Sequence, residues 1–219
     1  MKKEIWMCWF QGFNDPDFPK INKKCVNKWE ALNPKWNINK LTYQNIYKYT
    51  PEFFDIIKNS PKRSFPAQSD LLRILLLYKF GGVWADVNVY PTMPLKNIVK
   101  NTLNETGFFA YRFMPRLDKD SGSREIASWF LCVDKPKRYI IKKWKEEFIK
   151  RFKSSENFIY FSFHQTLCDL YDSDHEVRKI INNMKQLNQS APHSKQKSKY
   201  KSIPSYVYKK NKKTFFQLH

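Results

Sequence analysis

Phe65-Pro-Ala-Gln-Ser-Asp-Leu-Leu-Arg-Ile-Leu-Leu-Leu-Tyr-Lys-Phe-Gly-Gly-Val-Trp-Ala-Asp-Val-Asn-Val-Tyr90 is the stretch around which the rest of the sequence is organised. Residues 67–80 contain neither Gly nor Pro, and their apolar side chains are dense enough for a buried helix. Gly81 and Gly82 follow, and glycine ends helices because it adopts the left-handed conformation without steric cost. Residues 83–89 are rich in β-branched and aromatic side chains, which predicts a strand.

Two pairs of polar side chains interrupt this apolar stretch. Asp70 and Arg73 lie three residues apart, so they share one face of the predicted helix. Asp86 and Asn88 lie two residues apart, so they point to the same side if the strand stays extended there. Taken separately, the first pair is interpreted as a structural ion pair and Asp86 as a turn cap. Taken together, they predict a site, whose carboxylate and amide oxygens suit a hard divalent cation such as Mg²⁺ or Mn²⁺.

The order and spacing of these residues resemble one protein family. Ser69-Asp70-x-x-Arg73, followed by Gly81-Gly82-Val83-Trp84-x-Asp86-x-Asn88, is similar to the sugar-transferase segment of glycosyltransferase family 32. That segment is shared by the capsular polysaccharide synthesis proteins and the clostridial glucosylating toxins. The short chain, with its start Ile5-Trp-Met-Cys-Trp-Phe-Gln-Gly12, also resembles the small transferase domain of a chlorella-virus glycosyltransferase. The family pattern is S-D-x-x-R and then G-G-x-[YW]-x-D-x-[DTN], and the resemblance covers most of the chain. Many members carry a second Asp where this chain has Asn88, a neutral and weaker metal ligand.

The predicted fold class is α/β. Helices are predicted for residues 21–32, 51–57, 67–80, 136–152, 164–171 and 174–187, and strands for residues 5–10, 36–43, 83–89, 107–113 and 126–133. The alternation of strands and helices in the first half predicts a mainly parallel sheet flanked by helices. The resemblance implies a single Rossmann-like domain of the GT-A type.

Two further segments have a distinct composition. Residues 116–124 are polar and predict a loop over the site. Residues 194–219 are rich in Lys and aromatic side chains, so we expect the transferase domain to cover residues 1–193 and the remainder to be a tail or docked segment.

Composition limits the classes of function. The chain has 219 residues and a net charge of +20, which either reflects a solvated Lys-rich surface or attracts an anionic partner. No helix-turn-helix, zinc-finger, RRM or KH signature is present in the sequence, so nucleic acid is disfavoured as that partner. Four cysteines are scattered without a C-x-x-C spacing, and no apolar run is long enough to span a membrane. We therefore expect a cytoplasmic protein, with the basic segment 194–219 able to contact an anionic membrane surface.

The resemblance also assigns residues to the donor. Trp9, Phe10 and Gln11 are expected near the uridine of a uridine diphosphate sugar, although from the residues alone one of Trp6 and Trp9 is equally a core residue. Asp70 and Arg73 are expected at the sugar hydroxyls or the ribose, with Trp84 and Asp86 in the same nucleotide-sugar site. The expected catalytic residues are Asp70, Arg73 and Asp86.

Metal and acceptor sites follow in the same way. The expected metal ligands are Asp86, Asn88 and His193, since imidazole completes a Mn²⁺ shell better than a Mg²⁺ shell. Ser128, Trp129 and His164 are expected on the acceptor side, although a lone His among aromatic residues is more often a core residue.

The predicted function is metal-dependent transfer of a hexosyl unit from a nucleoside-diphosphate sugar to a hydroxyl of a glycan acceptor, with retention of configuration. The alternatives are a basic binding module for nucleic acid or an anionic surface, and a non-catalytic scaffold of a glycan-assembly complex.

Overall fold

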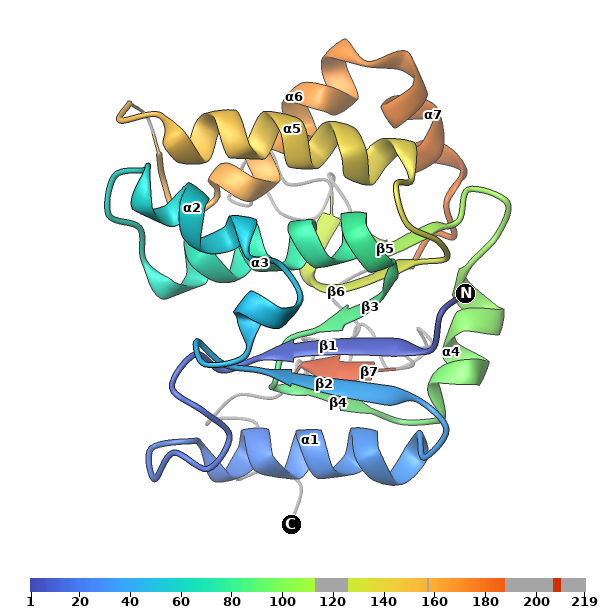
Figure 1. Cartoon of the computed structure of the whole chain (residues 1–219). Coiled ribbons are helices and arrows are strands. Elements are labelled where there is room, and N and C mark those ends of the chain that lie inside the picture. Colours follow the sequence, from blue (N-terminus) through green and yellow to red (C-terminus); the bar gives the residue numbers. More distant parts are fainter. Residues whose placement is uncertain (113–125, 157, 188–206, 210–219) are drawn as a thin grey trace, which may run out of the picture.

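The computed structural model describes residues 1–112, 126–156, 158–187 and 207–209. Its centre is a five-stranded sheet with the strand order β2-β1-β3-β6-β5 (Figure 1). The strands are β1 (Glu4–Cys8), β2 (Asn37–Leu41), β3 (Gly82–Ala85), β5 (Phe108–Arg112) and β6 (Ile126–Val133). β1 is parallel to β2 and β3, while β6 is antiparallel to both β3 and β5, so β6 alone of these five strands runs in the opposite direction. This arrangement confirms the predicted α/β class with a mostly parallel sheet.

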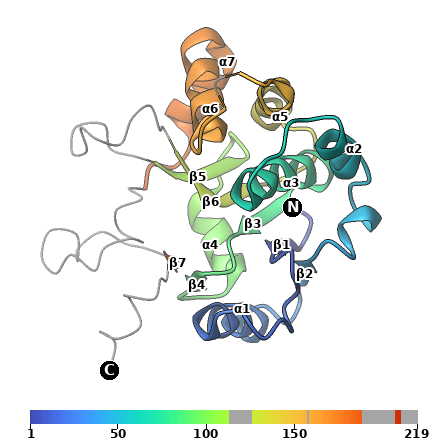
Figure 2. The same cartoon turned by 90° about the vertical axis from the view of Figure 1, so that its left-hand side faces the viewer.

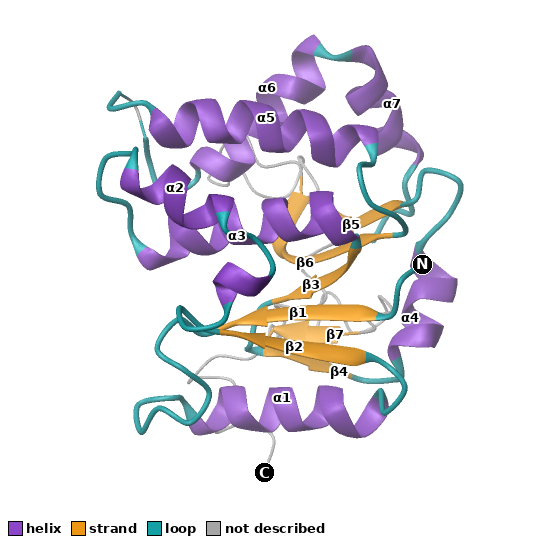
Figure 3. Cartoon of the chain, in the orientation of Figure 1, coloured by secondary structure: helices purple, strands orange, loops and turns teal. Residues whose placement is uncertain are grey.

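Helices cover both faces of the sheet (Figures 2 and 3). On one face lie α1 (Lys20–Leu32) and α4 (Leu95–Thr102). On the other face lie η1 (Ile46–Lys48), α2 (Glu52–Lys58), α3 (Phe65–Phe80), α5 (Tyr139–Lys153), α6 (Ser162–Ser173) and α7 (His175–Asn183). Each face has its own hydrophobic core, and alternate residues of β1 enter the two cores.

The central helix and its double-glycine end are confirmed. α3 begins at Phe65 with a Pro in its first turn, and ten of its residues are buried. Gly81 ends the helix with a φ of 68°, and its N–H donates to the carbonyl of Leu77. Gly82 has a φ of 90°, and a Cβ there would lie 2.6 Å from the carbonyl oxygen of Glu4. Glycine is therefore needed at position 82 because β3 approaches β1 closely.

The strand predicted over residues 83–89 is wrong in its second half. β3 ends at Ala85, and a second short strand, β4 (Val89–Pro91), follows the turn at residues 86–88. The N–H of Asp86 donates to the carbonyl of Trp129, and the N–H of Val89 donates to the carbonyl of Asp86 at 2.9 Å. The chain therefore turns at the polar residues, which occupy a tight turn and not one side of an extended strand.

Two other features of the main body, the helix α4 and the direction of β6, were not predicted. α4 was missed, although Pro94 precedes it, and the antiparallel direction of β6 was not foreseen. β7 (Val207–Lys209) pairs antiparallel with β4, so this part of the segment 194–219 forms a two-stranded sheet with the main body. The division of the chain after residue 193 stays a prediction. The loop at residues 116–124 and His193 lie outside the described residues. Within the described part of the chain, every helix is too short or too polar to cross a bilayer.

Candidate active site

A cavity of about 600 Å³ opens where β1 and β3 end. This edge of the sheet is the usual ligand site of open α/β folds, since loops leaving parallel strands diverge there. The cavity brings together eleven residues that sequence reasoning assigned to a site: Trp9, Phe10, Gln11, Asp70, Arg73, Trp84, Asp86, Asn88, Ser128, Trp129 and His164. They come from the loop after β1, from α3, from β3 and the turn after it, from β6 and from α6, so the fold gathers segments that are distant in sequence.

A buried ion cluster forms one wall of this cavity. The Nη1 of Arg73 lies 2.8 Å from Oδ1 of Asp70, and its Nη2 lies 3.1 Å from Oδ1 of Asp86. The Nε1 of Trp84 also donates to Oδ1 of Asp86, at 2.9 Å. The guanidinium lies over the ring of Trp84, 5.0 Å from its centroid. One arginine on α3 therefore joins its own helix to the turn after β3.

The charges of the cluster do not cancel. One guanidinium faces two carboxylates, so the ionised side chains of Asp70, Arg73 and Asp86 by themselves sum to one negative charge. The side chain of Arg73 is 5% exposed, that of Asp70 12% and that of Asp86 25%, so Asp86 is the most accessible of the three to a cation or a ligand. The Nε–H of Arg73 has no hydrogen-bond acceptor among the described residues. A group in the cavity could supply that acceptor.

The turn after β3 offers a small set of metal ligands. The carboxylate of Asp86 and the amide of Asn88 are both partly exposed and line the cavity. The described residues contain no group of three His, Cys, Asp or Glu side chains arranged to hold a metal. Two oxygen ligands fit a Mg²⁺-like ion that keeps waters and takes its remaining ligands from substrate phosphates. The residues therefore suit a cation that arrives with a diphosphate, and they do not form a closed metal site.

Trp6, on β1, and Trp9, directly after β1, have different environments. Trp6 is buried in the core, where its Nε1 donates to the carbonyl of Gly81 at 3.0 Å. Trp9 is half-buried and lines the cavity, with its ring 5.3 Å from that of Phe18. Phe10 lies on the opposite face of the sheet and stacks on Tyr43 at 4.6 Å. Trp6 is thus the core residue of the pair, and Trp9 is the one available to a ligand.

The α6 side of the cavity is aromatic. His164, in the first turn of α6, has the ring of Phe161 at 5.8 Å in an edge-to-face arrangement. Ser128 and Trp129 of β6 also line the cavity and are largely buried, and Trp129 packs in the core on the α1 face of the sheet. Tyr160 also lines the cavity and is 71% exposed, and sequence reasoning did not assign it to the site.

Cys8 also lines the cavity, and sequence reasoning did not assign it to the site. Burial raises the pKa of the Cys8 thiol, the Arg73 guanidinium lowers it and the Asp86 carboxylate raises it. The net effect keeps this thiol protonated at neutral pH, so it acts as a small apolar side chain beside the ion cluster.

The whole chain, residues 1–219, matches the family described as capsular polysaccharide synthesis protein. The chain belongs to this family. The membership confirms the resemblance drawn from the motif around Asp70, Arg73 and Asp86.

Individual relatives are more distant. The initiation-specific alpha-1,6-mannosyltransferase of Candida albicans is 27% identical over 107 residues, which are 46% of this chain and 27% of that protein. The chain spans less than half the length of the curated glycosyltransferases that it matches.

Among solved structures, the PaToxG glycosyltransferase is similar with a TM-score of 0.51 and 16% identity, covering 82% of this chain and 73% of that one. A glycosyltransferase involved in the glycosylation of the major capsid of PBCV-1 has a TM-score of 0.46 and 11% identity, covering 82% and 78%. The first of these similarities supports the predicted GT-A type of fold.

Proposed function

We propose that this member of the capsular polysaccharide synthesis protein family transfers a hexosyl unit from a uridine diphosphate sugar to a hydroxyl of a glycan acceptor. The observation that carries the proposal is the ion cluster, in which Arg73 joins Asp70 and Asp86 in a cavity at the ends of β1 and β3. A net negative charge, two oxygen ligands on one turn and an aromatic lining are what a diphosphate with its cation and a sugar require.

In this proposal, different residues of the cavity contact different parts of the donor. Asp70 and Arg73 bind the sugar hydroxyls or the ribose through charge-assisted hydrogen bonds, with Arg73 held in place by both carboxylates. Asp86 and Asn88 hold the divalent cation, Mn²⁺ or Mg²⁺, against the diphosphate. When bound there, the cation neutralises the charge that develops on the leaving diphosphate. His193 is a third proposed ligand outside the described residues.

The acceptor enters beside β6 and α6 in this proposal, where Ser128 and His164 line the cavity, while Trp129 lines it from the α1 face of the sheet. An inverting transferase needs a general base near the acceptor hydroxyl, commonly a carboxylate. Among the described residues of the cavity, the carboxylates are those of Asp70 and Asp86, and Arg73 holds both. This pairing favours transfer with retention, which NMR assignment of the product anomer would test.

The decisive variant is Asp86→Asn. The amide oxygen can still accept from Arg73 and Trp84, so the fold should persist while the negative charge at the cation is lost. We expect release of UDP from UDP-hexoses in Mn²⁺ to fall by at least about 100-fold, as for other lost electrostatic contacts in active sites. Asp55→Asn, on the exposed face of α2, is the matched control and should keep the wild-type rate. A wild-type rate in Asp86→Asn would refute the proposal.

Thermal-shift measurements separate the alternatives. A transferase is stabilised by UDP or a UDP-sugar in Mn²⁺, because a ligand of the native state raises its melting temperature. A nucleic-acid or anionic-surface module would ignore uridine nucleotides, and its binding would weaken steeply with salt. A scaffold would respond to neither ligand. The contact of residues 194–219 with an anionic membrane stays a prediction.

A further inference from the structure

Helix α1 buries an asparagine where its pattern calls for an apolar residue. Its buried residues are Asn22, Cys25, Val26 and Trp29, which recur at the spacing of one helix face turned toward the sheet. Asn22 is 7% exposed, a burial that matches its apolar neighbours. A polar side chain at such a position costs free energy unless its donors and acceptors are satisfied.

A second buried asparagine shows how this chain satisfies such a group. The amide nitrogen of Asn33 donates to the carbonyl of Trp29 at 2.9 Å, and its Oδ1 accepts from the N–H of Leu95 at 2.7 Å. Among the residues that the structure describes, the side-chain amide of Asn22 makes no such bond. Asn22 instead lines the cavity of the candidate active site. The partner that its amide lacks is one that a ligand in the cavity can supply.

The location of Asn22 indicates which part of a ligand it meets. Asp70 and Arg73 lie on α3, on one face of the sheet, whereas α1 covers the opposite face. Trp9 belongs to the α1 side, and its buried Nε1 is likewise without a hydrogen-bond partner among the described residues. Asp86 lies at the end of β3 between the two sides. Of the two donor placements proposed above, the one with the transferred sugar at α3 and the diphosphate at Asp86 extends the nucleoside toward Trp9 and Asn22.

We propose that Asn22 recognises the base of the nucleotide, with Trp9 beside it as the aromatic surface. This inference rests on the proposed function, because it takes the position of the base from that of the sugar. A carboxamide places one of its two N–H donors beside its carbonyl acceptor, and this pair complements the N3–H and the adjacent carbonyl of uracil. Proteins read single bases by this combination of edge hydrogen bonds and aromatic contact.

Isothermal titration of the full chain tests the assignment, with UDP, ADP and pyrophosphate each titrated in Mn²⁺. Asn22→Ala should weaken UDP binding about tenfold, the typical effect of losing one or two hydrogen bonds. Its affinity for pyrophosphate should stay unchanged, and its preference for UDP over ADP should fall. Asn27→Ala is the matched control, since Asn27 is exposed on the same helix. Without ligand, Asn22→Ala should melt at or above the wild-type temperature, because no hydrogen bond is lost.

Each result decides the question. UDP affinity that stays at the wild-type value in Asn22→Ala overturns the inference and leaves the proposed function intact. An equal loss for UDP and pyrophosphate also overturns it, because the amide would then contact the phosphates. A lower melting temperature with unchanged affinities would make Asn22 a structural residue. If the wild-type protein binds neither UDP nor ADP, the proposed function fails and the inference fails with it.

Discussion

The α3 side and the α1 side of the cavity differ in how their polar groups are satisfied. On the α3 side, Arg73 bonds to Asp70 and Asp86, and Trp84 bonds to Asp86, before any ligand arrives. On the α1 side, the indole N–H of Trp9 and the amide of Asn22 have no hydrogen-bond partner among the described residues.

This difference separates two ways of building a site. Groups that are already paired are positioned in advance, but they also carry part of the stability of the fold, so changing them affects both properties. Groups that are unpaired contribute little to stability and become satisfied when a ligand binds. Substitutions of the paired groups on the α3 side should therefore lower stability and activity together, whereas substitutions of Trp9 and Asn22 on the α1 side should chiefly lower affinity.

The largest effect is expected for Arg73→Ala. Its removal takes the guanidinium away from the buried Asp70 and the partly exposed Asp86, and breaking a buried ion pair on one side typically costs about 3–5 kcal/mol of unfolding free energy. Urea denaturation followed by tryptophan fluorescence measures this loss, and UDP release should disappear with it.

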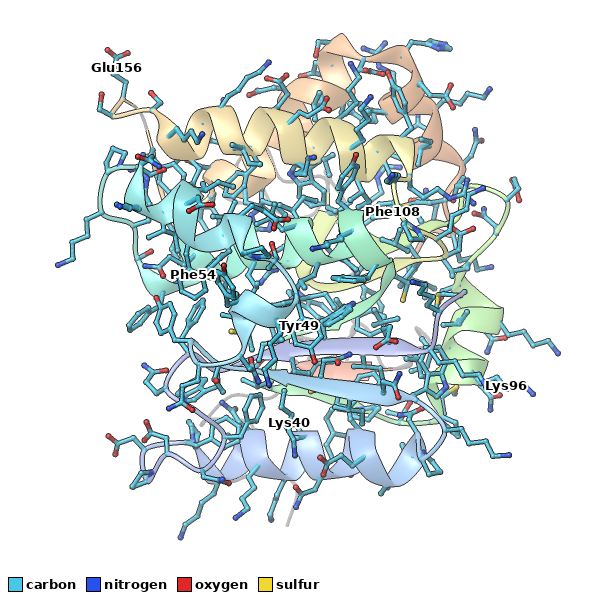
Figure 4. The ribbon with its side chains drawn as sticks, in the orientation of Figure 1. Lys40, Tyr49, Phe54, Lys96, Phe108 and Glu156 are labelled. Carbon is cyan, nitrogen blue, oxygen red and sulfur yellow. The ribbon has the colours of Figure 1, made fainter. Side chains whose placement is uncertain are left out.

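A surface ion pair provides the control for Arg73. Lys40 bonds to Glu30 at 2.8 Å, but both side chains are more than 40% exposed, and Lys40 lies on the edge strand β2 (Figure 4). Lys40→Ala should cost less than about 1 kcal/mol because water screens the pair. Equal losses in the two variants would show that burial does not set the importance of the Arg73 cluster.

Two tryptophans allow a direct comparison of the two sides. Trp84→Phe removes the N–H that Asp86 accepts and leaves space in a fully buried site, so we expect a loss of about 2–3 kcal/mol. Trp9 is half-buried, and its indole N–H has no partner among the described residues. Trp9→Phe should therefore lower the free energy of unfolding by less than about 1 kcal/mol. Urea midpoints of the two variants give both values. A larger loss for Trp9→Phe would contradict the proposed contrast between the sides.

The sequence was sufficient for features that depend on local signals. Local sequence predicted three features, because each is determined by neighbouring residues. They are the helix α3, its double-glycine end and the motif around Asp70, Arg73 and Asp86. The family membership inferred from that motif is confirmed by the match over the whole chain.

Features that depend on distant partners could not be read in this way. The turn at residues 86–88 forms where β3 meets β6, through a hydrogen bond from Asp86 to Trp129, and β6 lies about forty positions further along the chain. The polar group at Asn22 was overlooked because the helical pattern was recognised from its apolar members. An amide in line with Cys25 and Trp29 was the available signal.

The smallest effects on stability are expected for the two buried asparagines of the α1 side, Asn33 and Asn22, measured in the absence of ligand. Asn33 joins the end of α1 to the start of α4, because its Oδ1 accepts from Leu95 while its amide nitrogen donates to Trp29. Asn33→Ala leaves both of these groups unsatisfied in the core and should cost about 1–2 kcal/mol. Asn22→Ala removes no hydrogen bond within the described chain and should cost nothing measurable. Melting temperatures of both variants, measured without nucleotide, provide the check. Equal destabilisation would mean that the amide of Asn22 is already satisfied, and the proposed contrast between the α1 side and the α3 side would then fail.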